Sequence, residues 1–83
     1  MLTVLPIHRE VLVYIKKHNL GRKFEKQLGL LLANISHPSL NFEILEPKHL
    51  RIFSFRIDRK YRAIFIFRTA YTIEILDVNN HYK

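Results

Sequence analysis

Apolar side chains recur at helical spacing along the first 36 residues of the chain. One stripe contains Ile7, Val11, Leu12 and Ile15, widened by Tyr14, and a second contains Phe24, Leu28, Leu31, Leu32 and Ile35. This spacing is typical of amphipathic helices. Pro6 suits the first turn of a helix, and Pro38 would stop one, because the residue before a proline avoids the α region. The pattern predicts helices near residues 6–18 and 22–36, folded as a hairpin with a turn at Asn19-Leu20-Gly21.

After residue 49 the pattern changes to three strand-like runs, which are Leu50–Ile57, Tyr61–Arg68 and Tyr71–Val78. The segments between them, Asp58-Arg59-Lys60 and Thr69-Ala70, are too short for anything but antiparallel hairpins. Met1–Leu5 is a candidate for a short fourth strand, and Asn41–Leu45 has a composition compatible with extended backbone. We therefore predict one α+β domain over residues 1–83, with an N-terminal helical hairpin packed on a three- to four-stranded antiparallel sheet.

The first hairpin has a definite register, because a three-residue loop at Asp58–Lys60 places Arg56 opposite Arg62. The face that packs on the helices then carries Phe53, Phe55, Ile57, Tyr61, Ala63, Phe65 and Phe67. The other face carries Leu50, Ile52, Ser54, Arg56, Arg62, Ile64, Ile66 and Arg68. A two-residue loop at Thr69-Ala70 would place Asp77 opposite Arg62. The same loop would turn Glu74 toward the core, so the register of the last strand stays open.

Positive charge is concentrated in the strand region. The formal net charge is +7, and positions 48 to 62 contain Lys48, Arg51, Arg56, Arg59, Lys60 and Arg62, with Asp58 as the sole acid among them. A surface with this balance favours a polyanionic partner such as nucleic acid. These basic residues, together with Arg68, are candidate phosphate-binding groups.

Composition excludes several classes of protein. Hydrophobic residues make up 48% of the chain, which argues against disorder, and the absence of cysteine excludes disulfides and thiolate metal sites. The first ten residues lack the pattern of a signal peptide, and no stretch approaches the roughly 18 apolar residues of a transmembrane helix. We expect a soluble, cytoplasmic domain with no membrane partner.

Arg56 and Arg62 form the sharpest candidate site. Like charges side by side on a sheet are destabilising, by some tenths of a kcal/mol or more. Two guanidinium groups in that position are well suited to bind a phosphate between them. The alternative is a solvated face on which Asp77 or Asp58 forms a salt bridge. We expect Arg62 to be exposed, and therefore to contribute little to stability.

Acid–base chemistry could come from two further places. His81 and Tyr82 close the last strand, where an imidazole can exchange protons near neutral pH and a phenol can orient a substrate. The alternative is a frayed tail. Glu43 and Glu46 lie beside Lys48 and other cations, and a carboxylate there could accept a proton from a hydroxyl. For either glutamate the alternative is an ordinary salt bridge in a loop.

A metal site is not indicated. His37, His49 and His81 lie far apart in the sequence, with no H-x-x-x-H or H-E-x-x-H spacing. We expect neither a metal nor another cofactor.

Several motifs together resemble the RelE/ParE superfamily of type II toxin–antitoxin toxins, particularly its YoeB and YafQ branches. These motifs are HPSL-x-F-E after the helices, S-x-R-I on one strand, Y-R-A-I-F at the start of the next, and I-L-D-V-x-x-H followed by tyrosine at the end. The resemblance covers nearly the whole chain. It implies a helical hairpin on an antiparallel sheet, neutralisation by a cognate antitoxin in a hetero-oligomer, and, for ribosome-dependent members, cleavage of mRNA in the ribosomal A site.

The resemblance also implies roles for individual residues. Arg62 matches the strand arginine that stabilises the transition-state phosphate. His81 matches an acid or base, and Tyr82 matches an aromatic residue that orients the substrate. Glu46 lies near the position of the family's general-base glutamate and is preferred for this role over Glu43. Lys48 and His49 lie where other members keep lysine or histidine, which makes His49 a second candidate base.

The activity implied is metal-free RNA transesterification that inhibits translation. Two alternatives stay open, a ParE-like DNA gyrase poison without a nuclease site and a degenerate toxin that only binds its antitoxin. The His81-Tyr82 ending favours the nuclease.

Overall fold

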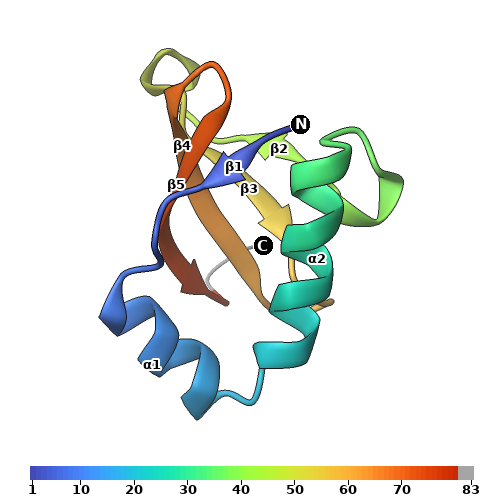
Figure 1. Cartoon of the computed structure of the whole chain (residues 1–83), viewed down its shortest axis with the longest axis vertical. Coiled ribbons are helices and arrows are strands. Elements are labelled where there is room, and N and C mark those ends of the chain that lie inside the picture. Colours follow the sequence, from blue (N-terminus) through green and yellow to red (C-terminus); the bar gives the residue numbers. More distant parts are fainter. Residues whose placement is uncertain (81–83) are drawn as a thin grey trace.

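The structure is a computed structural model and describes residues 1–80. These residues form β1 (Thr3–Val4), α1 (Arg9–Lys17), α2 (Gly21–Ala33), η1 (Pro38–Leu40), β2 (Glu43–Ile44), η2 (Lys48–Leu50), β3 (Phe53–Arg56), β4 (Arg62–Thr69) and β5 (Thr72–Asn79), where η denotes a short 3-10 helix (Figure 1). Within this part of the chain the sheet has five strands in the order β1-β5-β4-β3-β2. The predicted α+β architecture is confirmed.

The sheet is mixed, and in this respect the prediction of three or four antiparallel strands is wrong. β1 runs parallel to β5, with Thr3 paired to Thr72, whereas the other neighbours are antiparallel. Backbone bonds from Thr3 N to Tyr71 O (2.8 Å) and from Leu5 N to Ile73 O (2.9 Å) hold β1 in place. Both edge strands lie in segments that the sequence offered as extended, β1 within Met1–Leu5 and β2 within Asn41–Leu45. Each has only two residues, too few for an alternating pattern.

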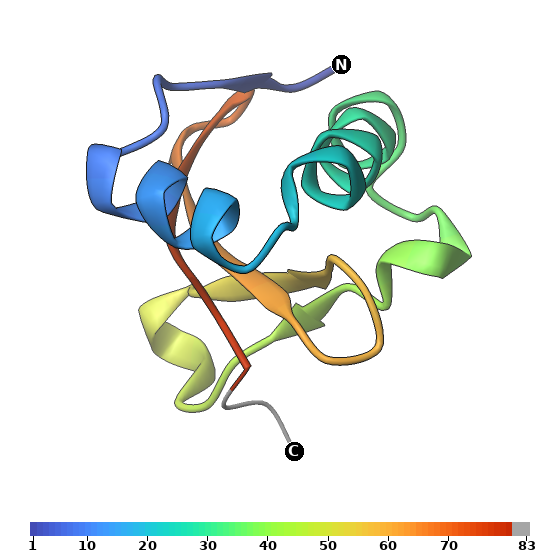
Figure 2. The same cartoon turned by 90° about the horizontal axis from the view of Figure 1, so that it is seen from below.

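Both α-helices cover the same face of the sheet, which curves around them (Figure 2). The core between them contains Val11, Ile15, Leu20, Phe24, Leu31, Leu40, Phe53, Phe55, Ile57, Ala63, Phe65, Ile73, Ile75 and Val78. The predicted core face of the first hairpin is therefore confirmed, with Tyr61 and Phe67 partly buried at its margins. The helices lie obliquely to each other rather than as a closely paired hairpin (Figure 1).

The helix boundaries differ from the prediction at both proline positions. α1 begins at Arg9, so Pro6 lies before the helix, in the segment that descends from β1. α2 ends at Ala33, and Pro38 is the first residue of η1 rather than the stop signal of α2. The turn between the helices is as predicted, because Asn19 adopts a left-handed conformation with φ of 57°.

The register of the first hairpin is confirmed, with Arg56 opposite Arg62. The second hairpin differs from the register of a two-residue loop, because the pairing shifts at two irregularities, between Ile64 and Phe65 and between Phe67 and Thr69. Asn79, not Asp77, therefore pairs with Arg62, and Asp77 pairs with Ile64.

Glu74 is likewise displaced from the core side to a position opposite Ile66. Its Oε2 lies 2.6 Å from His8 Nε2, and its Oε1 accepts a bond from Arg68 Nε at 2.5 Å. Hydrogen bonds from His8 and Arg68 lower the pKa of this carboxyl. The acid that appeared misplaced in the sequence thus has two basic partners at the surface.

Candidate functional site

Arg62 is the first residue of β4 and lies on the sheet face that turns away from α1 and α2. Its side chain is 3% exposed, which contradicts the prediction of an exposed arginine. Nε and Nη2 donate to Ser54 Oγ at 3.0 and 2.9 Å, and Nη2 donates to the backbone oxygen of Asn41 at 2.6 Å. The guanidinium plane is therefore fixed by a fully buried serine of the neighbouring strand and by the segment that leads into β2.

Glu43 is the carboxylate that the fold brings to this arginine. β2 places Glu43 opposite Ser54, and Glu43 Oε1 lies 4.0 Å from Arg62 Nη2. Glu46, the preferred candidate from the sequence, is exposed in the turn beyond β2. The geometry therefore favours the alternative glutamate, because its strand pairing fixes its side chain on the same face as Ser54.

A depression of about 420 Å³ opens beside Arg62 on this face. Its lining consists of Leu45, Ile52, Ser54, Arg62, Ile64, Asp77 and Asn79. Asn79 Nδ2 donates to Asp77 Oδ2 at 2.8 Å, so the two polar residues of β5 are joined at the rim. The depression combines an aliphatic surface with a fixed cation and a carboxylate, a composition common in small ligand sites.

The predicted phosphate-binding residues do not gather in one place. Arg56 is the cross-strand neighbour of Arg62 and shares its face. Arg59 and Lys60 lie in the β3–β4 loop, where they line a separate depression of about 550 Å³ with Lys23 and Asp58. The exposed side chains of Lys48 and His49 belong to η2. Among the basic candidates within residues 1–80, the strand register thus pairs Arg56 and Arg62.

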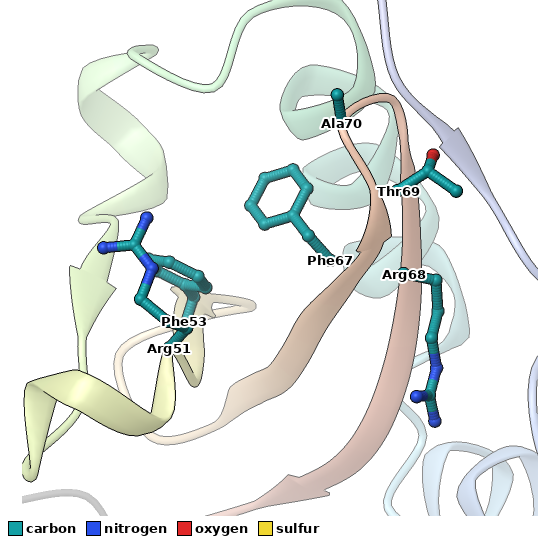
Figure 3. Close-up of a pocket in the computed structure, with 6 residues that line it drawn as sticks. All are labelled: Arg51, Phe53, Phe67, Arg68, Thr69 and Ala70. Atoms are coloured by element: carbon teal, nitrogen blue, oxygen red, sulfur yellow. The ribbon is translucent and has the colours of Figure 1, made fainter.

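Arg51 and Arg68 lie at the opposite end of the sheet, beside an aromatic depression of about 400 Å³ (Figure 3). The guanidinium carbon of Arg51 lies 5.3 Å from the centre of the Phe53 ring, in cation–π geometry. Arg68 points away from Phe67, toward the side where it pairs with Glu74 (Figure 3). In this structure Arg51 therefore packs on Phe53 and Arg68 pairs with Glu74, and neither lies beside Arg62.

His81 and Tyr82 lie outside the described residues, so their predicted roles as acid or base and as substrate-orienting group stay predictions. Asn79, two positions before His81, pairs with Arg62. Within residues 1–80, no three histidine or acidic side chains converge as a metal site would require. Nor is any helix in that range long and apolar enough to cross a membrane.

Sequence reasoning missed three contributors to this site, namely Asn41, Ser54 and Asn79. Ser54 could have been found, because the parity of the first hairpin places it on the face of Arg62. The backbone oxygen of Asn41 could not, because it reaches Arg62 through an irregular segment with no periodic signal. Asn79 depended on the unpredicted irregularities of the second hairpin.

The chain has the same α+β fold as several solved toxin structures. The YoeB/ParE toxin from Agrobacterium tumefaciens superposes with a TM-score of 0.71 over 98% of both chains at 13% identity. YafQ from E. coli gives 0.73 over 98% of this chain and 92% of its own at 10% identity. The YoeB–YefM complex from Staphylococcus aureus gives 0.71 over 99% of both chains at 18% identity. The sequence matches no family model and no curated protein.

Proposed function

We propose that the chain is the toxin of a type II toxin–antitoxin system and that it cuts mRNA on the ribosome by metal-free transesterification. The observation that carries this proposal is the fixed guanidinium of Arg62, with Arg56 as its cross-strand neighbour and Glu43 at 4.0 Å. A cation held in place before the reaction can stabilise developing charge without reorganising. The fold shared with YoeB and YafQ supports the same assignment.

The chemistry assigns one role to each group. Glu43 removes the proton of the ribose 2′-hydroxyl, and the 2′-oxygen attacks the adjacent phosphorus. Arg62 and Arg56 stabilise the charge on the phosphoryl oxygens as the bond to the 5′-oxygen breaks. His81 protonates that leaving oxygen, and Tyr82 orients the substrate. The products are a 2′,3′-cyclic phosphate and a 5′-hydroxyl end. Glu46 and His49 are the alternative bases to be tested against Glu43.

The proposed partners follow from this activity and from charge. The ribosome and its mRNA supply the polyanion that a net charge of +7 favours, which would place the action of the protein in the cytoplasm. YoeB from Staphylococcus aureus forms a complex with YefM. By analogy, we assign this chain a cognate antitoxin that neutralises it in a hetero-oligomer.

The burial of Arg62 also favours a second candidate, a toxin that acts by binding, as a gyrase poison does. A guanidinium held by Ser54 and Asn41 has the contacts of a structural arginine as well as those of a prepared catalytic group. Under this second candidate Glu43 and His81 would have no chemical role.

The deciding experiment expresses the parent chain, Glu43→Gln, His81→Gln and the surface control Glu25→Gln in cells. Bulk translation, mRNA 5′ ends and plasmid supercoiling are followed together. For a nuclease we expect new 5′ ends at A-site codons with the parent and the control, reduced by about 10²-fold or more in the two site variants. Unchanged toxicity of both site variants, with altered supercoiling and no new ends, would establish the poison instead.

A further inference from the structure

The depression beside Arg62 offers a binding surface that the transesterification steps do not use. Leu45, Ile52 and Ile64 supply its aliphatic lining, and Asp77 with Asn79 supplies a polar edge. None of these five side chains acts on the ribose or the phosphate in the proposed reaction. A flat, largely apolar ring with polar edge atoms suits such a surface better than a phosphate does.

The carboxylate of Asp77 limits which kind of ring the depression can bind. A carboxylate repels a phosphate and accepts N–H donors, so the group that meets it must carry donors. Asp77 is opposite Ile64 on β4, two positions beyond Arg62. Two residues along a strand span about 7 Å and neighbouring strands lie about 5 Å apart, so the backbone of Asp77 is roughly 8 Å from that of Arg62, which is the scale of one nucleotide. In the proposed reaction the Arg56–Arg62 pair stabilises the phosphate, and Asp77 lies at the right distance to meet the edge of a neighbouring base.

The geometry points to guanine, and we propose that Asp77 reads a guanine base next to the scissile phosphate. Guanine presents two adjacent donors, N1–H and the N2 amino group, on its Watson–Crick edge, and a carboxylate can accept both in one plane. Adenine and cytosine each present a single amino group there, and uracil a single N–H. Unpaired bases in RNA are read along this edge. The inference rests on the proposed nuclease function and adds its base preference.

Asn79 is the positioning residue for this contact. Its amide nitrogen donates to Asp77 Oδ2 at 2.8 Å, which fixes the plane of the carboxylate at the rim. Asn79 is also the cross-strand partner of Arg62. It therefore connects Asp77, which would contact the base, to Arg62, which would stabilise the phosphate.

Binding to the purified chain tests the site without requiring cleavage. Guanosine, adenosine, cytidine and uridine 3′-monophosphates are titrated separately, and chemical shifts of backbone amides are followed by NMR. We expect guanosine 3′-monophosphate to bind roughly tenfold more tightly than the others, with the largest shifts in β4 and β5, since a bidentate base contact typically gives this discrimination. Asp77→Asn should lose most of that preference. Glu25→Gln, which also converts a carboxylate to an amide but on the exposed side of α2, should keep it. Equal binding of the four nucleotides by the parent would overturn the proposal.

Mapping of mRNA ends separates this inference from the proposed function. We expect the parent to enrich guanine beside the cut, and Asp77→Asn to flatten that enrichment per cut. Cutting by the parent without guanine enrichment would refute the base site and leave the nuclease intact. Selective binding of the guanosine nucleotide by a parent that makes no cuts would support the base site and refute the nuclease.

Discussion

Arg62 combines two properties that seldom occur together, burial and a formal charge. Buried charges persist in proteins when their hydrogen-bonding capacity is used, and Ser54 and Asn41 use three bonds of this guanidinium. Removing the side chain therefore affects both the fold and the proposed chemistry. Activity lost on its removal is informative only when stability is measured in the same variant.

We expect Arg62→Ala to lower the free energy of unfolding by about 2–4 kcal/mol, because it leaves buried acceptors without donors and opens a cavity. Urea denaturation followed by circular dichroism measures this cost. Arg59→Ala, in the exposed β3–β4 loop, is the matched control and should change stability by less than about 0.5 kcal/mol. A stable Arg62→Ala protein would mean that the arginine is not a structural element.

Substitutions of Ser54 can distinguish the structural role of Arg62 from its proposed role in catalysis. Ser54→Ala removes the oxygen that accepts two of its bonds, so we expect a loss of about 1–3 kcal/mol in stability and a larger relative loss in cleavage rate than in substrate affinity. Ser54→Thr keeps the hydroxyl and should recover most of the rate if its added methyl group is accommodated. Equal rates for Ser54→Ala and the parent at a temperature where both are folded would contradict a positioning role.

Sequence alone identified the inward and outward faces of the first hairpin, because Phe53, Phe55, Ala63 and Phe65 alternate strictly over a short loop. It did not predict the burial of Arg62. That burial depends on the irregular segment between η1 and β3, which places a backbone oxygen over the outer face, and no periodicity encodes such a contact. The same segment brings Glu43, and not Glu46, to within 4.0 Å of Arg62.

At the scale of elements, the β3–β4 loop is tied to the helices at two points. Asp58 accepts bonds from the backbone of Lys60 and Tyr61 and from Lys23 of α2, at 2.8, 2.9 and 3.1 Å. The Tyr61 hydroxyl lies 3.2 Å from His18 Nδ1 in the turn between α1 and α2. Partial burial by itself would raise the pKa of Asp58, but these backbone bonds and Lys23 outweigh it and lower the pKa.

The lowered pKa of Asp58 predicts a pH-dependent stability. Its charged form is favoured in the folded state, so its contribution is complete above the ordinary value of 3.8 and is lost as the pH falls through and below that value. Asp58→Asn should be about 1 kcal/mol less stable than the parent from neutral pH down to about pH 5, and this difference should shrink toward pH 3. Urea denaturation at several pH values measures it. A difference that persists undiminished at pH 3 would show that the carboxylate charge is not the cause.

The second hairpin shows why its register was not predictable. Two irregularities offset the pairing between β4 and β5, and each changes which side chains share a face. The length of the Thr69-Ala70 turn alone therefore does not fix the register of the second hairpin. The pairing of Glu74 with His8 and Arg68 depends on the same shifts.

At the scale of the molecule, the excess positive charge predicts how the proposed antitoxin binds. We expect an acidic, partly disordered segment, whose affinity falls markedly between 50 and 500 mM salt because the attraction is screened. Isothermal titration calorimetry over this range measures the effect. A basic neutralising partner, or an affinity unchanged by salt, would contradict the prediction.

β1 and β5 come from opposite ends of the described chain and pair with each other. The backbone N–H of Thr3 donates to the backbone oxygen of Tyr71, so this pairing joins residues that are separated by most of the sequence. Contacts between segments this distant in sequence are slow to form, because the entropy of closing the intervening loop opposes them. During synthesis β5 leaves the ribosome after every other element, yet it lies between β1 and β4 in the sheet. The core therefore cannot close until this strand has emerged, and a nascent chain that lacks it should not yet have the folded surface that an antitoxin would bind.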